Sequence, residues 1–137
     1  MWLALLLACT SPLDTGDARD SDTEEPDPEP VAEPTFADIA EALDEVCRGC
    51  HTSAFPHGEM VLHTSGYANL VNRPSTQVPS LSRIEPGSLD DSYLWHKLQA
   101  SHRSVGGQGE SMPPVGRIWP DWHNQTLLNW IEQGAPL

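Results

Sequence analysis

Positive charge is scarce in this sequence. The 137 residues include seven lysines and arginines against twenty aspartates and glutamates, so the formal net charge is −13. A nucleic-acid-binding protein gathers basic side chains on one face to neutralise phosphates, whereas the basic residues here are scattered along the chain. The charge balance therefore argues against nucleic acid as a partner.

Long apolar runs and regular alternation of apolar and polar residues are also missing. The apolar run over residues 1–9 is far too short for a membrane-spanning helix, which needs about 20 residues. Alternating segments of the kind that form half-buried strands are almost absent. The pattern predicts an all-α fold of three to four short helices with long loops.

A cysteine closes the N-terminal apolar run. Leu6-Leu7-Ala8-Cys9 resembles the lipobox of bacterial lipoproteins, in which cleavage before the cysteine exposes a residue that is then diacylated. More than one acyl chain makes membrane attachment stable. We therefore expect residues 1–8 to be a lipoprotein-type signal peptide and Cys9 to be the lipidation site. The run is short for a secretory signal and lacks a positive n-region, so a stray hydrophobic start is the alternative.

Residues 9–34 are acidic and rich in proline. The stretch from Ser11 to Pro34 holds nine acidic side chains and a single base, Arg19. Such a stretch cannot bury enough apolar surface to offset its chain entropy, and its charges and prolines favour extension. We expect a disordered tether with no chemistry of its own, which leaves residues 35–137 as the folded domain.

Two helix starts are marked by side chains that can cap a helix. Thr35 with Asp38 resembles a capping box, and Ser88 with Asp91 repeats the spacing before a second helix that we expect to reach Gln99. After Thr35, apolar residues recur at helical spacing and lead directly into a pair of cysteines. These positions are Phe36, Ile39, Ala40, Leu43, Val46, Cys47 and Cys50.

A third helix is predicted over residues 122–133. Asp121 can cap its start, and Gly134 followed by Pro136 ends it. A shorter helical turn is expected over residues 67–71. Helices this short, joined by long loops, bury little core, so a large buried cofactor would supply the missing apolar centre. The apolar stripe of the third helix is Leu127, Trp130 and Ile131.

The first predicted helix runs into the segment Cys47-Arg48-Gly49-Cys50-His51. C-x-x-C-H is the attachment sequence of c-type haem. Two thiols add to the two vinyl groups at one edge of the porphyrin, and the adjacent histidine then ligates the iron. We therefore expect one covalently attached haem c, bound through Cys47 and Cys50 with His51 as an iron ligand.

Three other uses of this segment are weaker. A disulfide between Cys47 and Cys50 would close a loop too small to hold a domain of this size. A zinc site usually needs a second pair of ligands at a characteristic spacing, and the sequence has no second C-x-x-C. A thioredoxin-like dithiol lies at the start of a helix, whereas Cys47 lies at the end of one.

The sixth iron ligand is predicted to be Met112. Methionine is a common choice in electron-transfer cytochromes, and the proline after Met112 favours an extended loop that can bring the thioether over the iron. Met60 follows His51 by only nine residues, an awkward reach to the opposite face of the ring. His96 and His102 are the main competitors, and packing of Met112 in the core is the other alternative.

Five segments follow one another in an order that is found in a known family. They are CRGCH at 47–51, YANLVNRPS at 67–75, RIEPG at 83–87 with SYLWHKL at 92–98, MPP at 112–114, and NWIEQGAP at 129–136. Together they resemble the monohaem cytochrome c domains of bacterial periplasmic and surface lipoproteins. The resemblance covers essentially all of residues 36–137.

The resemblance implies a class I cytochrome c fold around a covalently bound haem. An N-terminal helix would carry the haem motif, a C-terminal helix would pack across it, and His51 and Met112 would be the axial ligands. It also implies that Arg83 lies near the haem propionates, with a solvated arginine as the alternative. The tryptophans expected around the porphyrin or between helices are Trp95, Trp119, Trp122 and Trp130.

The function expected from these features is electron transfer. The protein would be a monomeric, non-enzymatic c-type cytochrome, held by its lipid in the bacterial periplasm or at the cell surface, with other redox proteins as partners. One alternative is a haem peroxidase-like enzyme or a gas or redox sensor with an open or histidine-ligated sixth position. Another is a zinc-binding interaction module.

Overall fold

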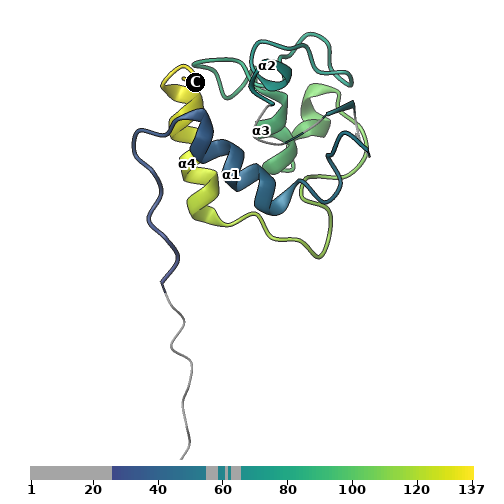
Figure 1. Ribbon diagram of the computed structural model, residues 1–137. Coiled ribbons are helices and arrows are strands. Elements are labelled where there is room, and N and C mark those ends of the chain that lie inside the picture. Colours follow the sequence, from purple (N-terminus) through teal and green to yellow (C-terminus); the bar gives the residue numbers. More distant parts are fainter. Residues whose placement is uncertain (1–25, 55–58, 61, 63–65) are drawn as a thin grey trace, which may run out of the picture.

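The computed structural model describes residues 26–54, 59, 60, 62 and 66–137. No strand forms within these residues, where backbone pairing between loops is limited to isolated bridges. None of the helices described is long and apolar enough to cross a bilayer. The predicted all-α class is confirmed. The elements in chain order are α1 (Phe36–Val46), α2 (Tyr67–Leu70), α3 (Tyr93–Leu98), the 3-10 helix η2 (His102–Val105) and α4 (Asp121–Glu132) (Figure 1).

The predicted capping box opens α1. The carboxylate of Asp38 accepts hydrogen bonds from the backbone N–H of Thr35 at 2.8 Å and from its hydroxyl at 2.9 Å. One face of the helix is buried, with Ile39 and Leu43 each 1% exposed, because residues three and four apart share a face. The helix ends where Cys47 donates its N–H to the carbonyl of Leu43 at 2.8 Å. The C-x-x-C-H segment therefore begins at the C-terminal cap.

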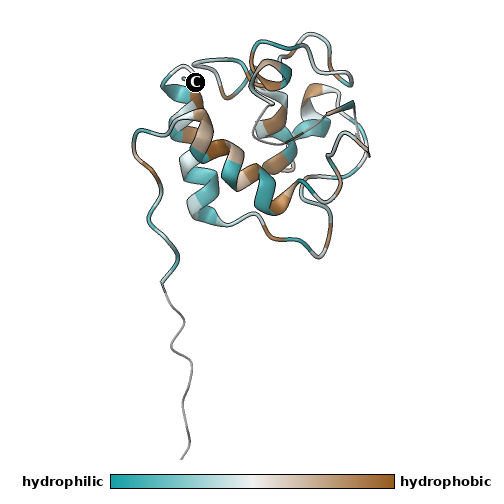
Figure 2. Cartoon of the chain, in the orientation of Figure 1, coloured by the Kyte–Doolittle hydropathy of each residue, from teal (hydrophilic) through white to brown (hydrophobic). Residues whose placement is uncertain are grey.

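α4 packs against α1 and completes the core (Figure 1). Leu127, Trp130 and Ile131 are each 0% exposed, which confirms the predicted stripe. The ring centroids of Phe36 and Trp130 lie 6.0 Å apart, and Tyr67 of α2 meets Phe36 edge-on at 5.2 Å. Figure 2 shows apolar positions interspersed with hydrophilic ones along both helices. Each helix thus buries one face and leaves the other to solvent.

The start of α4 differs from the prediction by one residue. Pro120 is the N-cap, and Asp121, predicted as the cap, is the first helical residue. Proline suits this place because its φ of −62° leads into a helix and it has no N–H to satisfy. The carboxylate of Asp121 still favours the positive end of the helix dipole. At the other end, Gly134 has a φ of +92°, so the predicted stop is confirmed.

The predicted second helix begins later than expected, at Tyr93, so the prediction over residues 88–92 was wrong. Ser88 and Asp91 do pair, with the serine hydroxyl donating to the carboxylate at 2.7 Å, but they close a turn. The hydroxyl of Ser92 donates to the carbonyl of Ser88 at 2.7 Å and accepts the N–H of Glu85 at 2.9 Å. Such local side-chain bonds compete with helical hydrogen bonding.

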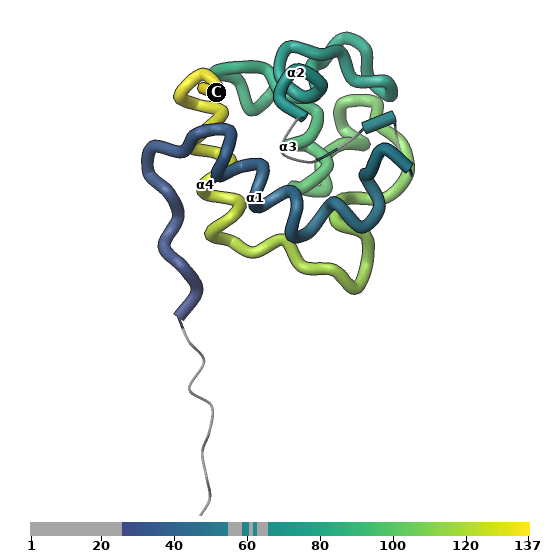
Figure 3. The backbone as a smooth tube through the Cα atoms, in the orientation of Figure 1, coloured from purple at the N-terminus to yellow at the C-terminus, as the bar shows by residue number. Residues whose placement is uncertain are grey.

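Residues 31–34, here called the N-terminal strap, pack along α4 before the first helix begins (Figure 3). Pro34 is fully buried. Two side chains of α4 and that of its C-cap residue hold the strap backbone, so the packed unit includes the last residues of the predicted tether. The hydrogen bonds join the N–H of Val31 to Thr126 Oγ1 at 3.0 Å, Asn129 Nδ2 to the carbonyl of Val31 at 2.9 Å, and Gln133 Nε2 to the carbonyl of Ala32 at 2.6 Å.

Candidate functional site

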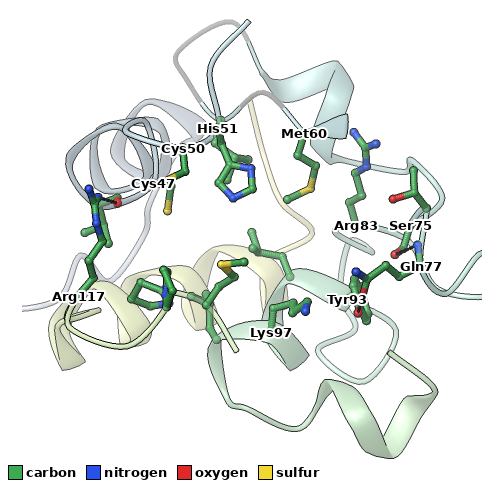
Figure 4. A pocket seen from close by; sticks show the side chains of 18 residues that line it. Cys47, Cys50, His51, Met60, Ser75, Gln77, Arg83, Tyr93, Lys97 and Arg117 are labelled. Carbon is green, nitrogen blue, oxygen red and sulfur yellow. Dashed lines mark hydrogen bonds between the residues drawn. The ribbon is translucent and has the colours of Figure 1, made fainter. Parts of the chain in front are cut away.

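A mostly apolar pocket of about 400 Å³ lies at the C-terminal end of α1 (Figure 4). This volume is within the range of about 300–1,000 Å³ that is typical of small-molecule and cofactor sites. The predicted lipidation site Cys9 and the predicted signal peptide, residues 1–8, lie outside the described residues. Every other residue predicted to bind the cofactor lines the pocket, namely Cys47, Cys50, His51, Arg83 and Met112.

One carbonyl group organises the C-x-x-C-H segment. The carbonyl oxygen of Cys47 accepts the N–H of Cys50 and the N–H of His51, both at 3.1 Å. The chain therefore turns tightly at the end of α1. His51 is buried, and Leu62 donates its N–H to the His51 carbonyl at 2.9 Å. Backbone hydrogen bonds thus place both thiols and the imidazole on one part of the pocket wall.

The two cysteines are free thiols, which counts against a disulfide between them. Burial raises the pKa of Cys47 to about 12, although Arg117 opposes the rise. Such a thiol is protonated at neutral pH, whereas activated thiols of dithiol redox sites have pKa values of about 7.5 or less. Among the described residues, no three His, Cys, Asp or Glu side chains come together to hold a metal ion. Within the described residues, neither a thioredoxin-like dithiol nor a zinc site is therefore supported as the use of the C-x-x-C-H segment.

Met112 belongs to the wall that faces His51. Figure 4 shows Lys97 on the side of the pocket opposite His51, and the backbone N–H of Met112 donates to the carbonyl of Lys97 at 2.9 Å. Met60 also lines the pocket, but Figure 4 shows it beside His51. Met112 lines the pocket, and its backbone is therefore held on the side opposite the imidazole of His51.

The histidines considered as other sixth ligands are engaged elsewhere. The ring nitrogens of His96 hydrogen-bond with the hydroxyl of Ser101 at 2.9 Å and the carbonyl of Asp90 at 2.8 Å. The Nε2 atom of His102 hydrogen-bonds with the carbonyl of Gly109 at 3.1 Å. Neither histidine lines the pocket. A histidine-ligated sixth position has no support from these two side chains.

One end of the pocket is polar and cationic. The guanidinium of Arg83 donates to the carbonyl and the side-chain oxygen of Asn69 at 2.9 and 2.7 Å, and to the carbonyl of Glu59 at 3.2 Å. Burial lowers the pKa of Arg83, but a guanidinium stays charged at neutral pH. Figure 4 places Tyr93 and Gln77 at the same end, joined by a hydrogen bond from the tyrosine hydroxyl. This end suits the anionic groups of an otherwise apolar ligand.

Arg117 and Lys97 line the pocket but could not be assigned a role from the sequence. The Nη1 atom of Arg117 donates to the carbonyl of Val46 at 2.9 Å, and its guanidinium covers Gly49. The two ends of that hydrogen bond are 71 residues apart in the sequence. No local pattern in the sequence predicts such a contact. The one indication is that Val46 precedes Cys47 and that Arg117 lies five residues after Met112.

The tryptophans do not surround the pocket. Trp130 lies in the core between α1 and α4, and Trp95 and Trp119 pack against that core. The expected place between helices is therefore supported for Trp130, and none of the four tryptophans lines the pocket. The residues absent from the pocket lining are Trp95, Trp119, Trp122 and Trp130.

Comparison with known proteins found no match to the chain among family models, curated proteins or solved structures. The pocket itself therefore carries the functional evidence. It combines two thiols next to an imidazole, a thioether on the facing wall, a mostly apolar lining and a cationic end. These are the donors and surroundings that a covalently bound haem needs. The residues present fit the cofactor that the C-x-x-C-H segment predicts.

Proposed function

We propose that this chain is a c-type cytochrome that carries electrons. One haem would be attached through Cys47 and Cys50, with His51 and Met112 as its axial ligands. The observation that carries the proposal is the pairing of C-x-x-C-H on one wall of the pocket with Met112 on the other. Bound haem would supply a one-electron couple between ferrous and ferric iron.

The protein's own residues suit electron transfer better than catalysis. His51 is buried, and its segment is held by backbone hydrogen bonds at 3.1 and 2.9 Å. Met112 is fixed through its backbone to the end of α3. Ligands held from both walls leave no coordination position for a substrate. The proposal therefore includes no bond-making chemistry by the protein itself.

We propose a cytochrome c-like fold on the basis of one packing arrangement. α1 leads into the C-x-x-C-H segment, and α4 from the C-terminal end packs across α1. The pocket is lined by Val46 and Cys47 at the end of α1, and Cys47 also packs against the apolar core, so the core and the pocket meet there. A large apolar cofactor there would extend the core of a small domain.

The proposal extends to location and partners. Cys9 would carry the lipid, and the acidic residues up to the N-terminal strap would separate the domain from the membrane surface. Haem attachment of this type takes place outside the cytoplasmic membrane, which agrees with an exported lipoprotein. The protein would then exchange electrons, as a monomer, with other redox proteins in the periplasm or at the cell surface.

The test is the visible absorption of the full chain, produced in a bacterium that attaches haem c. The purified protein should keep its haem under denaturing conditions and show a low-spin c-type α band when reduced. A Cys47→Ser, Cys50→Ser double variant should lose the covalent haem. Cys9→Ser should keep it while losing attachment to membranes. Absence of covalent haem from the wild-type protein would overturn the proposal, and high-spin iron would favour an enzyme or sensor.

A further inference from the structure

Lys97 holds the loop that carries Met112 at two points. Its Nζ atom donates to the carbonyls of Gln108 and Glu110, both at 2.8 Å, although Lys97 is only 9% exposed. Its own carbonyl accepts the N–H of Met112 at 2.9 Å. One residue of α3 therefore contacts the loop through both its side chain and its backbone.

The charge of Lys97 is directed at this loop. The ion pairs within the described part of the chain join other residues, Arg48 with Asp44 and His123 with Glu45. Besides the two loop carbonyls, the ammonium lies 5.9 Å from the centroid of the Tyr93 ring. Burying an ammonium is unfavourable unless its donors are satisfied. A buried lysine that bonds only to carbonyls of one short loop is therefore well placed to fix that loop.

Other contacts bring the loop close to α3 and η2. Arg103 donates through Nη2 to the carbonyl of Gly109 at 2.9 Å, and His102 bonds the same oxygen at 3.1 Å. At Gly107 an added Cβ atom would lie 2.7 Å from the carbonyl oxygen of His102 and would also clash with the Tyr93 hydroxyl. The loop is thus packed on one side, and the N–H of Gln108 also donates to Gln77 Oε1 at 3.2 Å. Lys97 adds the charged donor to this set of contacts.

We infer that Lys97 is a positioning residue for Met112. Its ammonium gathers the carbonyls of Gln108 and Glu110, and its carbonyl sets the backbone of Met112, so the thioether stays on the wall opposite His51. The inference rests on the proposed function, because it is the role of Met112 as an iron ligand that this arrangement controls.

Removing the ammonium should free the loop. Two carbonyls would lose a charged donor, and the state with the loop closed would become less favourable than the open one. Met112 would then leave the facing wall for part of the time. A small external ligand would bind more tightly, since its apparent affinity rises with the population of the open state.

The experiment compares Lys97→Leu with Arg103→Gln in the haem-loaded full chain. Leucine removes the charge and, unlike methionine, cannot ligate iron from the pocket wall, whereas Arg103 is an exposed cation that bonds the neighbouring Gly109 carbonyl. The readouts are the near-infrared methionine-to-iron band of the oxidised protein, its reduction potential and its affinity for imidazole. Lys97→Leu should weaken the band, lower the potential and tighten imidazole binding by roughly tenfold or more, the factor that one lost charged hydrogen bond gives. Arg103→Gln removes a solvent-exposed bond to the same loop and should have a clearly smaller effect on all three.

Each outcome decides the inference. A Lys97→Leu protein with wild-type band, potential and imidazole affinity would overturn it. Should that variant fail to fold, Lys97→Gln, which loses the charge but keeps amide donors, must still bind imidazole more tightly than wild type, and an unchanged affinity would overturn the inference. Failure of the proposed function would be seen separately. Wild-type protein without covalent haem would contradict haem attachment, and a Met112→Ala variant that keeps the near-infrared band would contradict the ligand assignment, whatever Lys97 does.

Discussion

The guanidinium of Arg117 covers Gly49, one of the two residues between the cysteines of the pocket. A Cβ atom added at Gly49 would lie 3.0 Å from Nη2 and 3.3 Å from Nη1 of Arg117. The same guanidinium donates to the carbonyl of Val46 at 2.9 Å, and so satisfies an orphan group at the end of α1. A cation at this place is favourable because it meets the negative end of the helix dipole. This contact joins the loop after Met112 to the C-x-x-C-H segment.

Replacing the cation should change the potential more than the fold. Arg117→Gln removes a positive charge from beside the cysteines, and a nearby positive charge favours the reduced, less positive iron. Because Arg117 is exposed, we expect a decrease of a few tens of millivolts, the equivalent of about 1 kcal/mol or less. A potentiometric titration at low and high salt measures it. Arg117→Lys, which keeps the charge, should stay within a few millivolts of wild type, and equal potentials in both variants would refute the prediction.

The two methionines of the pocket should differ in their effect on the iron. Met112→Ala should abolish the near-infrared methionine-to-iron band and lower the potential by a sizeable part of the roughly 0.8 V range that axial ligands govern. Met60→Ala is the matched control, because Met60 lines the same pocket on the side of His51. Loss of the band in Met60→Ala, with its retention in Met112→Ala, would move the ligand to Met60.

The capping box of α1 should contribute stability that depends on pH. Hydrogen bonds from the backbone and side chain of Thr35 lower the pKa of Asp38 below its ordinary value of 3.8. Because the folded pKa lies below the unfolded value, the contribution is complete above pH 3.8 and is lost as the pH falls through the folded pKa. Asp38→Ala should therefore lower the free energy of unfolding by about 1 kcal/mol at neutral pH and by less in acid.

Urea denaturation at neutral pH and at the lowest pH where the protein still folds measures this difference. Glu41→Ala is the control, since Glu41 is an exposed acid of the same helix. Its effect at neutral pH should be smaller than that of Asp38→Ala, because no hydrogen bond joins Glu41 to the start of the helix among the described contacts. A penalty for Asp38→Ala that stays constant from neutral to acid pH would rule out the carboxylate as its source.

The N-terminal strap should stabilise the domain through Thr126. This hydroxyl accepts the N–H of Val31 at 3.0 Å and donates to the carbonyl of Trp122 at 2.8 Å. Thr126→Val removes both hydrogen bonds at a site that is 2% exposed, so we expect a loss of about 1–2 kcal/mol in the free energy of unfolding. Thr126→Ser keeps the hydroxyl and should lose clearly less. Wild-type stability in Thr126→Val would contradict the prediction, because valine keeps the methyl group and removes only the hydroxyl.

The sequence predicted the parts of the molecule that local chemistry decides. α1 and α4 could be predicted because their apolar residues recur every three or four positions and their ends carry capping residues. The C-x-x-C-H segment predicted residues of the pocket wall, because haem attachment requires two thiols and a histidine at this spacing. In each case the residues that carry the signal are neighbours in the chain.

The parts that the sequence did not predict depend on contacts between distant segments. Ser88 and Asp91 have the spacing of a helix start, but Ser92 bonds to their turn, and the helix begins only at Tyr93. Lys97 and Arg117 could be assigned no role, because their partners are set by how the loops fold back. The strap is the extreme case, with Asn129 and Val31 joined across 98 residues.

The N-terminal strap also determines how the domain would respond to force. A pull on a lipid anchor upstream would first meet the hydrogen bonds of Val31 and Ala32 with α4, not the first turn of α1. Two of these bonds are at Val31 and the third is at Ala32, so all three would have to break before tension reached Phe36 and the helix that leads into Cys47. The proposed haem segment would thus be separated mechanically from movements of the membrane to which the protein is proposed to be attached.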